Sequence, residues 1–559
     1  MVGFLAHPVA KTRRHLRRYG EIADVLAMHG FANVADQLGL PRPARRVLLG
    51  RRASGEMTLP ERARVALQEL GPTFIKFGQS LSTRPDMVPD EFVRELEKLQ
   101  DELPPVPLEE ILAVIEEELG RPADEVFEAF EAVPIAAASI GQVHRARLRG
   151  GREVVVKVRR PGIDLQIRVD TELLTDLASA AERRTTWGRR YGVSEVVEEF
   201  ARSLEEQLDF VLEGRYADLF RLRLEPDSPV QIPLVHWDFT TSRVLTMDYV
   251  NGIKISHVAE LEAAGHDLPR IARTLLDYVL RQALIEGLFH ADPHPGNIAV
   301  REDGTLVFVD FGLVGFLDNR LRGWIGDMII GFVVGDERVM AEALMNIGRV
   351  YDRSGQEELA LEVGRLFRRY HNPSLSKPSV GEVMLGALRG VTKYGARVPG
   401  EGALFIKTLV SIEGLCLRLY PELDVPAVSK PVADLLLRER FDPARIYDMA
   451  KRNTQMAARL AAEFPERLQR LMNKAESGAL RMTVDLGEVQ RLQSRLDVIA
   501  NRLIVGLLVS ATLVASALMF RSGLGPAFFG IPILGALGFL TGFLIGARLL
   551  IAVIRSGNI

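Results

Sequence analysis

The sequence predicts an α+β fold with two lobes, because strand signals are concentrated in one stretch and helical signals dominate the stretch that follows. Residues 135–162 contain two apolar segments around Arg149-Gly150-Gly151, a pattern typical of a β-hairpin. Residues 231–252 predict two more strands, and residues 296–312 predict a short strand pair. From about 316 to 492 the pattern is helical, without a clear strand signal.

The composition is that of a large folded protein. Of 559 residues, 47% are hydrophobic and 26% are charged, which excludes a disordered chain. Lys and Arg number 70 and Asp and Glu 73, for a net charge of −3, so no nucleic-acid partner is expected. The single cysteine, Cys416, excludes an internal disulfide and a cysteine-ligated zinc or iron–sulfur site.

Four polar side chains occur in an order that predicts phosphoryl transfer. Asp292 is followed by Asn297, and Asp310-Phe311-Gly312 comes after the predicted strand pair. In phosphoryl transfer one carboxylate orients or deprotonates the nucleophile, while a carboxamide and a second carboxylate hold magnesium. Lys157, inside a β-branched strand, is expected to reach the phosphates of the nucleotide. We therefore expect Asp292 and Lys157 to be catalytic and Asn297 and Asp310 to bind Mg²⁺, in a two-lobed protein-kinase-like fold.

Two histidines beside this motif have the spacing of a helical zinc pair. Pro293 and Pro295 prevent a continuous helix between His290 and His294, so no zinc site is expected. His290 is predicted to support the Asp292 loop instead.

The C-terminus predicts a transmembrane helical hairpin. Residues 503–520 carry no charge and would form about 27 Å of helix, close to the thickness of the bilayer hydrocarbon. A second apolar run covers 530–547, and the turn between the runs contains Gly523, Gly525 and Pro526. The alternative is a buried hydrophobic hairpin in a large soluble protein.

The N-terminus shows no secretory signal, so we expect the soluble part to stay in the cytoplasm. Its first basic residues are Lys11, Arg13, Arg14, Arg17 and Arg18, with no acidic residue before Glu21. Two interpretations stay open for this stretch: contact with anionic lipid headgroups, or a solvated helix face.

Three segments of the sequence resemble the UbiB family of atypical protein-kinase-like ATPases, which is linked to ubiquinone and isoprenoid-lipid metabolism. Residues 74–79, with 82–86 and 99–101, are similar to the family's Lys-x-Gly-Gln element and its extension. Residues 134–144 resemble its alanine-rich nucleotide loop, and 290–297 its catalytic loop. The resemblance runs from about Leu59 to Gly414, and the terminal hairpin is similar to that of bacterial members.

The resemblance implies ATP and Mg²⁺ as cofactors and assigns further residues to the site. Those expected to bind the nucleotide, in addition to Lys157, are Ala136, Ala137, Ala138, Ser139, Met247 and Tyr249. Those expected to regulate it, by covering the site or pairing with its lysines, are Lys76, Gly78, Gln79, Gln207 and Asp209. Because alanine carries a Cβ, the alanine-rich loop is expected to be stiffer than a glycine-rich one.

One position departs from the family pattern. Gln207 stands where the family usually has the Glu of Glu-x-Asp, so the charge that would pair with Lys76 or Lys157 is lost. Glu205 and Glu206 are nearby acids that would substitute. Which acid pairs with which lysine is left open.

Together these features predict five segments. They are a basic N-terminal helical arm at 1–55, a helical extension with the Lys-x-Gly-Gln element at 56–130, a kinase-like N-lobe at 131–260, a kinase-like helical C-lobe at 261–490, and a linker with two transmembrane helices at 491–559.

The predicted function is that of an atypical kinase or ATPase anchored in the bacterial inner membrane, with its kinase-like domain facing the cytoplasm and supporting ubiquinone biosynthesis. The expected partners are the lipid bilayer and either quinone-precursor lipids or quinone-biosynthesis proteins, and a homodimer is one assembly that the sequence allows. Two alternatives are a nucleotide-switched scaffold and a conventional protein kinase.

Overall fold

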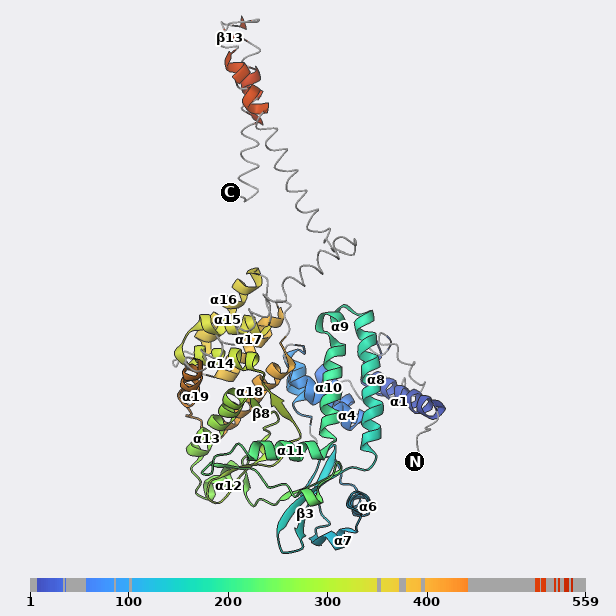
Figure 1. Cartoon of the computed structure of the whole chain (residues 1–559). Coiled ribbons are helices and arrows are strands. Elements are labelled where there is room, and N and C mark those ends of the chain that lie inside the picture. The colour runs from blue at the N-terminus through green and yellow to red at the C-terminus, as the bar shows by residue number, and fades with distance from the viewer. Residues whose placement is uncertain are drawn as a thin grey trace, which may run out of the picture. The chain divides into compact units, whose positions relative to one another are not determined.

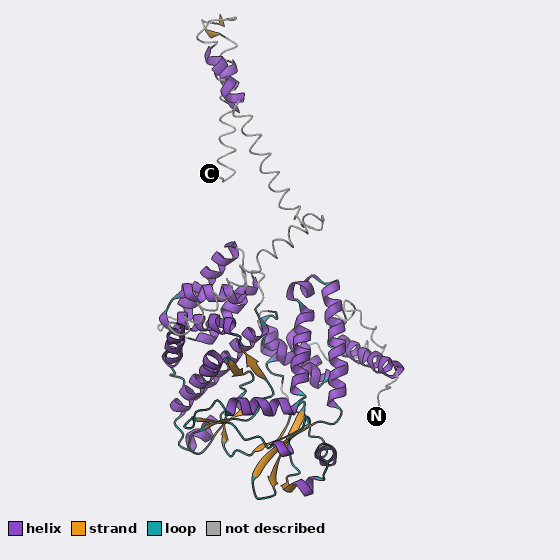
Figure 2. Ribbon diagram, viewed as in Figure 1, coloured by secondary structure: helices purple, strands orange, loops and turns teal. Residues whose placement is uncertain are grey.

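The computed structural model describes residues 8–33, 36, 57–84, 87–99, 103–348, 353–370, 379–393, 398–440 and short pieces between 508 and 545. The chain divides into two units, Met1–Ile446 and Tyr447–Ile559. In the first unit the strands lie mostly in the lower part of the view and the helices above and beside them (Figure 2). This separation of strands from helices is the α+β arrangement that the sequence predicts.

A five-stranded antiparallel sheet forms one end of the first unit. Its strands are β1 (Phe127–Phe130), β2 (Ala136–Ala137), β3 (Gly141–Leu148), β4 (Glu153–Arg159) and β6 (Val244–Asp248), in the order β1-β3-β4-β6 with β2 on β3. The β-hairpin predicted within residues 135–162 is confirmed, because β3 and β4 pair along their length. Gly150 and Gly151 in its turn have φ of 110° and 84°, values that favour glycine.

The alternation of side chains along β4 gives this sheet two different faces. Val154, Val156 and Val158 are fully buried against α6 (Leu108–Leu119) and α7 (Ala123–Val126), which cover one face (Figure 1). Lys157 lies between these valines in the sequence and therefore points to the opposite face. Lys157 therefore lies on the face of the sheet opposite the hydrophobic core that the valines form with α6 and α7.

Three helices are inserted between β4 and the helix that follows them, α11 (Phe210–Arg221). They are α8 (Ile163–Arg184), α9 (Thr186–Tyr191) and α10 (Val193–Gln207). The sequence predicts one helical region from 195 to 224, but the structure divides it between α10 and α11. Asp209 causes the break because its side chain accepts a hydrogen bond from the Val211 N–H (3.0 Å) and so caps the new helix.

Four helices before the sheet pack together. They are α1 (Pro8–Met28), α3 (Leu59–Leu70), α4 (Pro72–Ser82) and α5 (Asp90–Leu96). Two of them, α1 and α4, contact α8 of this insertion. The Lys-x-Gly-Gln element lies on α4, and Phe77 meets Phe200 of α10 edge-to-face with ring centroids 5.2 Å apart. This contact fastens the element to the insertion.

The rest of the first unit is mainly helical. Its helices are α12 (Val258–Ala263), α13 (Leu268–Arg281), α14 (Asn319–Val334), α15 (Glu337–Gly348), α16 (Arg353–Tyr370), α17 (Val380–Lys393), α18 (Gly400–Leu419) and α19 (Val425–Arg440). Two small sheets accompany them: β5 (Val230–Gln231), β10 (Leu306–Phe308), β9 (Ile298–Val300) and β7 (Ile253–Lys254) in that order, and β8 (Leu288–His290) with β11 (Val314–Phe316). The predicted strand pair near Asp310 is confirmed as β9 and β10.

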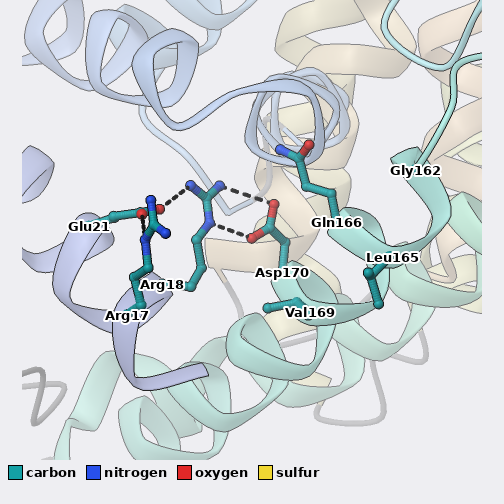
Figure 3. Close-up of a pocket in the computed structure, with 8 residues that line it drawn as sticks. All are labelled: Arg17, Arg18, Glu21, Gly162, Leu165, Gln166, Val169 and Asp170. Carbon is teal, nitrogen blue, oxygen red and sulfur yellow. Dashed lines mark hydrogen bonds and ion pairs between the residues drawn. The ribbon is translucent and has the colours of Figure 1, made fainter. Parts of the chain in front are cut away.

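The N-terminal helix α1 is held by a buried ion pair. Arg18 binds Asp170 of α8 through two hydrogen bonds, Nε to Oδ1 at 2.7 Å and Nη2 to Oδ2 at 3.1 Å (Figure 3). Arg18 also donates to the Leu70 carbonyl. The Arg18 and Asp170 side chains line a hollow of about 330 Å³ between α1 and α8. Arg17 pairs with Glu21 on its own helix. At least one arginine of the basic stretch therefore serves the fold.

We expect Asp170→Asn to destabilise the docking of α1 strongly. Asp170 is 1% exposed and Arg18 18% exposed, so the substitution leaves a largely buried guanidinium without its counter-charge. Breaking such a pair costs about 3–5 kcal/mol. The measurement is the midpoint of denaturant unfolding together with the rate of proteolysis within α1. Asp434→Asn, which makes the same change in an exposed carboxylate on α19, is the control and should shift neither quantity.

The predicted transmembrane hairpin lies in part outside the described residues, and its described parts include helical residues at 508–512, 514–518 and 537–541. Its described pieces include the short paired strands β12 (Ala527–Phe528) and β13 (Ile531–Pro532). Among the residues that the structure describes, no helix is both long and apolar enough to cross a membrane.

Candidate nucleotide and magnesium site

Three charged side chains from separate elements meet beside the sheet. Lys157 Nζ on β4 lies 2.7 and 2.9 Å from the two carboxylate oxygens of Glu213 on α11. The same ammonium lies 3.2 Å from Oδ2 of Asp310, which follows β10. Glu213 is 3% exposed and Asp310 40% exposed. The arrangement leaves one carboxylate buried as an anchor for the lysine and the other open to a ligand.

The charges of these groups depend on each other. Burial alone would lower the pKa of Lys157, but the Asp310 and Glu213 carboxylates more than offset it and raise that pKa. Burial also disfavours the charged form of Asp310, yet Lys157 and the Gly312 amide lower the pKa of Asp310 to about 2. For Glu213 burial prevails and raises the pKa, with Lys157 opposing it. Asp310 is thus an anionic oxygen donor at neutral pH, the type of ligand that Mg²⁺ prefers.

The candidate catalytic loop, residues 290–297, connects β8 to β9 and is tied to the Asp310 segment by a buried histidine. His290 Nε2 is hydrogen-bonded to the Asp310 carbonyl, and the Asp292 backbone N–H donates to His290 Nδ1 (3.3 Å). Both bonds together require a neutral ring with its proton on Nε2. Burial lowers the pKa of His290, which favours that neutral form. The expected supporting role of His290 is confirmed.

The side chains of the loop remain available for chemistry. Asp292 is exposed, and its backbone carbonyl accepts a hydrogen bond from Asn297 Nδ2 (3.2 Å). That bond orients the carboxamide while leaving Asn297 Oδ1 as an acceptor for a cation. Within the described ranges no cluster of three or more His, Cys, Asp or Glu side chains forms a metal site. Magnesium sites that include substrate phosphates need only one or two carboxylates from the protein, so Asp310 and Asn297 fit such a site.

The alanine-rich loop is held by neighbouring backbone. Ala136 and Ala137 form β2, and the Ala137 carbonyl accepts from the Leu103 N–H (3.2 Å). Ala138 donates its N–H to the Gly141 carbonyl, while its own carbonyl accepts from Arg160 Nε (2.8 Å). These bonds agree with the stiffness expected from the sequence.

The hydroxyl of Ser139 at the end of this loop lacks a partner. Its side chain is 1% exposed, and Oγ forms no hydrogen bond within the described part of the chain. An unmade bond at a buried hydroxyl is unfavourable, and an acceptor oxygen supplied by a nucleotide would satisfy it. The loop therefore fits the nucleotide-binding role that the family resemblance implies.

Met247 lies on the same face of the sheet as Lys157. It is opposite Val155 on the neighbouring strand, two residues from Lys157. Tyr249 follows β6, and its ring lies under the guanidinium of Arg145 at 4.2 Å. Met247 therefore lies on the face of the sheet that carries Lys157. Tyr249 lies just after β6, and the guanidinium of Arg145 covers its ring.

Two residues of the Lys-x-Gly-Gln element have structural roles. A Cβ at Gly78 would lie 2.4 Å from Leu99 Cδ1, so only glycine fits without rearrangement. Gln79 Nε2 donates to the Leu99 carbonyl (3.0 Å). Both therefore fasten α4 to the segment after α5. Burial lowers the pKa of Lys407 of α18, and the ammonium of Lys76 lies near enough to lower it further by repulsion, while the Asp292 carboxylate raises it.

Glu213, the direct partner of Lys157, is the site residue that the sequence analysis missed. The proposed substitutes Glu205 and Glu206 lie exposed on α10 and are wrong as partners of Lys157. Gln207 Nε2 is 3.5 Å from Ser203 Oγ, and Asp209 caps α11, the helix that carries Glu213. Asp209 thus acts on the site by positioning. Helices α8–α10 separate Glu213 from β4 in the sequence, so the pairing of Glu213 with Lys157 could not be read from neighbouring residues. The usable signal was a glutamate in the first turn of the helix that Asp209 caps.

Comparison with known proteins gives matches over most of the chain. Family models match the ABC1 atypical kinase-like domain at 98–344, the UbiB helical domain at 363–424, and the ABC1/UbiB kinase-like C-terminal domain at 487–555.

Relatives match over similar lengths. A probable protein kinase UbiB from Pseudomonas aeruginosa is 34% identical over 74% of this chain and 79% of its own. One from Xanthomonas campestris pv. campestris is 33% identical over 90% and 93%. An uncharacterized protein from Clostridium pasteurianum is 31% identical over 97% and 99%.

Among solved structures, the erythromycin complex of a Mycobacterium tuberculosis protein aligns with a TM-score of 0.44 and 22% identity, covering 65% of this chain and 93% of that one. The range matched by the ABC1 kinase-like model, 98–344, contains Lys157, Asp292, Asn297 and Asp310. The chain belongs to the ABC1/UbiB family of atypical kinase-like proteins.

Proposed function

We propose that this protein is an atypical kinase or ATPase that uses ATP and Mg²⁺ at the surface of the bacterial inner membrane and supports ubiquinone biosynthesis. The observation that carries the proposal is the ion-paired group of Lys157, Glu213 and Asp310, joined through His290 to the loop that presents Asp292. The link to quinones rests on the sequence resemblance and on the name of the UbiB relatives.

Each residue has a defined part in the proposed mechanism. Lys157, fixed by Glu213, would bind nucleotide phosphates, and Asp310 and Asn297 would hold a magnesium ion, which would supply charge neutralisation there. Asp292 orients the acceptor oxygen and takes its proton. His290 keeps the two loops in register, so that the metal ligands and the base face the same substrate.

The acceptor side separates this proposal from a conventional protein kinase. No Ala-Pro-Glu segment follows Gly312, and the Lys-x-Gly-Gln element brings Lys76 toward the surroundings of the catalytic loop. We therefore propose a small, lipid-like quinone precursor, or a protein that handles one, as the partner. A homodimer remains compatible with this proposal.

Turnover in liposomes tests the proposal. The purified full chain is reconstituted with ATP and Mg²⁺, with and without a phenolic quinone-precursor analogue. We expect phosphate release that the analogue stimulates, without labelling of protein, and a decrease on the order of 10²–10⁴-fold in Asp292→Asn. Nucleotide binding without turnover would instead select the scaffold, and transfer of phosphate to protein would select a protein kinase.

We propose that the apolar runs at 503–520 and 530–547 anchor the protein in the bilayer, with the kinase-like domain facing the cytoplasm. Truncation before Asn501 should give a protein that is soluble without detergent and still binds nucleotide, because the first unit, Met1–Ile446, has its own core. The measurement is flotation with liposomes together with nucleotide binding. Aggregation or lost nucleotide binding would show that the runs belong to the fold.

A further inference from the structure

Helix α18 is docked directly on the catalytic loop. Thr408 Oγ1 donates to the Ala291 carbonyl (3.3 Å), one residue before Asp292. Phe405 meets Phe289 of β8 edge-to-face with ring centroids 5.3 Å apart. Phe405 and Thr408 are both 0% exposed, so the helix segment between them is fixed against the loop. Lys407 belongs to that segment.

Lys407 is a half-buried cation that the proposed mechanism has not used. Its electrostatic neighbours are the carboxylates of Asp292 and Glu97 and the ammonium of Lys76. Burial lowers the pKa of Lys407, and the two carboxylates oppose that shift. Within the described ranges its ammonium forms no direct ion pair or hydrogen bond with a carboxylate. A cation that costs desolvation without a close counter-charge is suited to meet an anion brought by a ligand.

The site needs such a cation on the acceptor side. Residues 290–297 contain no lysine or arginine. Lys157, on β4, already forms hydrogen bonds with the carboxylates of Glu213 and Asp310. During phosphoryl transfer, charge spreads over the equatorial oxygens of the moving group, between the leaving nucleotide and the acceptor beside Asp292. A positive charge placed there stabilises the transition state more than the ground state.

We propose that Lys407 binds the γ-phosphoryl group of ATP beside Asp292 and stabilises it during transfer, an inference that rests on the proposed function. In this step the acceptor oxygen bonds to the γ-phosphorus and the bond from phosphorus to the bridging oxygen of ADP breaks. The acceptor's proton passes to Asp292, and Lys407 keeps its own proton. Lys407 thus distinguishes nucleotides that carry a γ-phosphate from those that do not.

Binding of ATP and ADP to the full chain in Mg²⁺ tests this role. Lys407→Met removes the charge and keeps an unbranched side chain of similar length, and Lys407→Gln is a second neutral variant in case the first folds poorly. We expect each to weaken ATP binding about tenfold while ADP affinity stays within about twofold, and to slow single-turnover cleavage by about 10²-fold or more. Lys407→Arg should retain most of both properties. Arg418→Met, three turns along the same helix and exposed, removes the same charge away from the loop and should change neither.

Equal loss of ATP and ADP affinity in the neutral variants would overturn the inference, because it would make Lys407 a structural counter-charge for Asp292. Unchanged ATP affinity and turnover would overturn it as well. Absence of nucleotide binding by the unaltered chain would contradict the proposed function itself, and the role of Lys407 would fall with it.

Discussion

Asp310→Asn is expected to weaken magnesium-dependent nucleotide binding at least about tenfold, the largest effect of any single change at the metal site. The substitution keeps the size of the side chain and removes its negative charge. Asp310 is anionic in the folded protein, because Lys157 and the Gly312 amide hold its pKa at about 2. An amide oxygen is a weaker ligand for a hard dication. The measurement is thermal stabilisation of the full chain by ATP, with and without Mg²⁺.

The control for this variant is Asp303→Asn. Asp303 lies exposed in the turn between β9 and β10, on the same strand pair but away from the metal. It should respond to Mg²⁺-ATP like the unaltered protein. If Asp310→Asn keeps the full magnesium-dependent shift, Asp310 is not a metal ligand.

Glu213→Gln is expected to lower turnover on the order of 10²-fold or more. Glu213 holds Lys157 through two hydrogen bonds in a buried position, and without its charge Asp310 is the remaining anionic partner of the lysine. The lysine would then compete with Mg²⁺ for the Asp310 carboxylate. The measurement is single-turnover cleavage of ATP across a series of Mg²⁺ concentrations, with a higher Mg²⁺ requirement expected for the variant.

Glu206→Gln is the matched control, since it makes the same change in an exposed acid at the end of the preceding helix. Its turnover and Mg²⁺ requirement should equal those of the unaltered chain. If both variants lose turnover equally, the loss comes from removing any negative charge near α10 and α11 and not from the ion pair. If Glu213→Gln keeps full turnover, the ion pair between Glu213 and Lys157 is not needed for catalysis.

The local parts of the site were predictable from the sequence. The β3–β4 hairpin, the strand carrying Lys157, the β9–β10 pair and the order of Asp292, Asn297 and Asp310 all follow from short-range patterns. Such patterns report turn residues and side-chain alternation, which depend on neighbours in the chain. They are reliable where one element alone decides the position of a residue.

The long-range pairs were not predictable in the same way. Glu213 reaches Lys157 only after three inserted helices, and the α10–α11 break at Asp209 depends on a side-chain cap. Arg18 has the appearance of a solvated or lipid-facing cation in the sequence, yet it pairs with Asp170 on α8. The Glu213 and Arg18 contacts are chosen by tertiary packing between segments far apart in the chain, whereas the Asp209 cap is local and was missed because the helical pattern continues across it.

Calorimetric titration of the full chain with ATP, in Mg²⁺ and again in its absence, tests the central claim most directly. The assembled group of Lys157, Glu213, Asp310 and Asn297 predicts saturable binding at one site per chain that weakens at least about tenfold without the metal. No saturable binding, or binding of equal strength with and without Mg²⁺, would contradict the account.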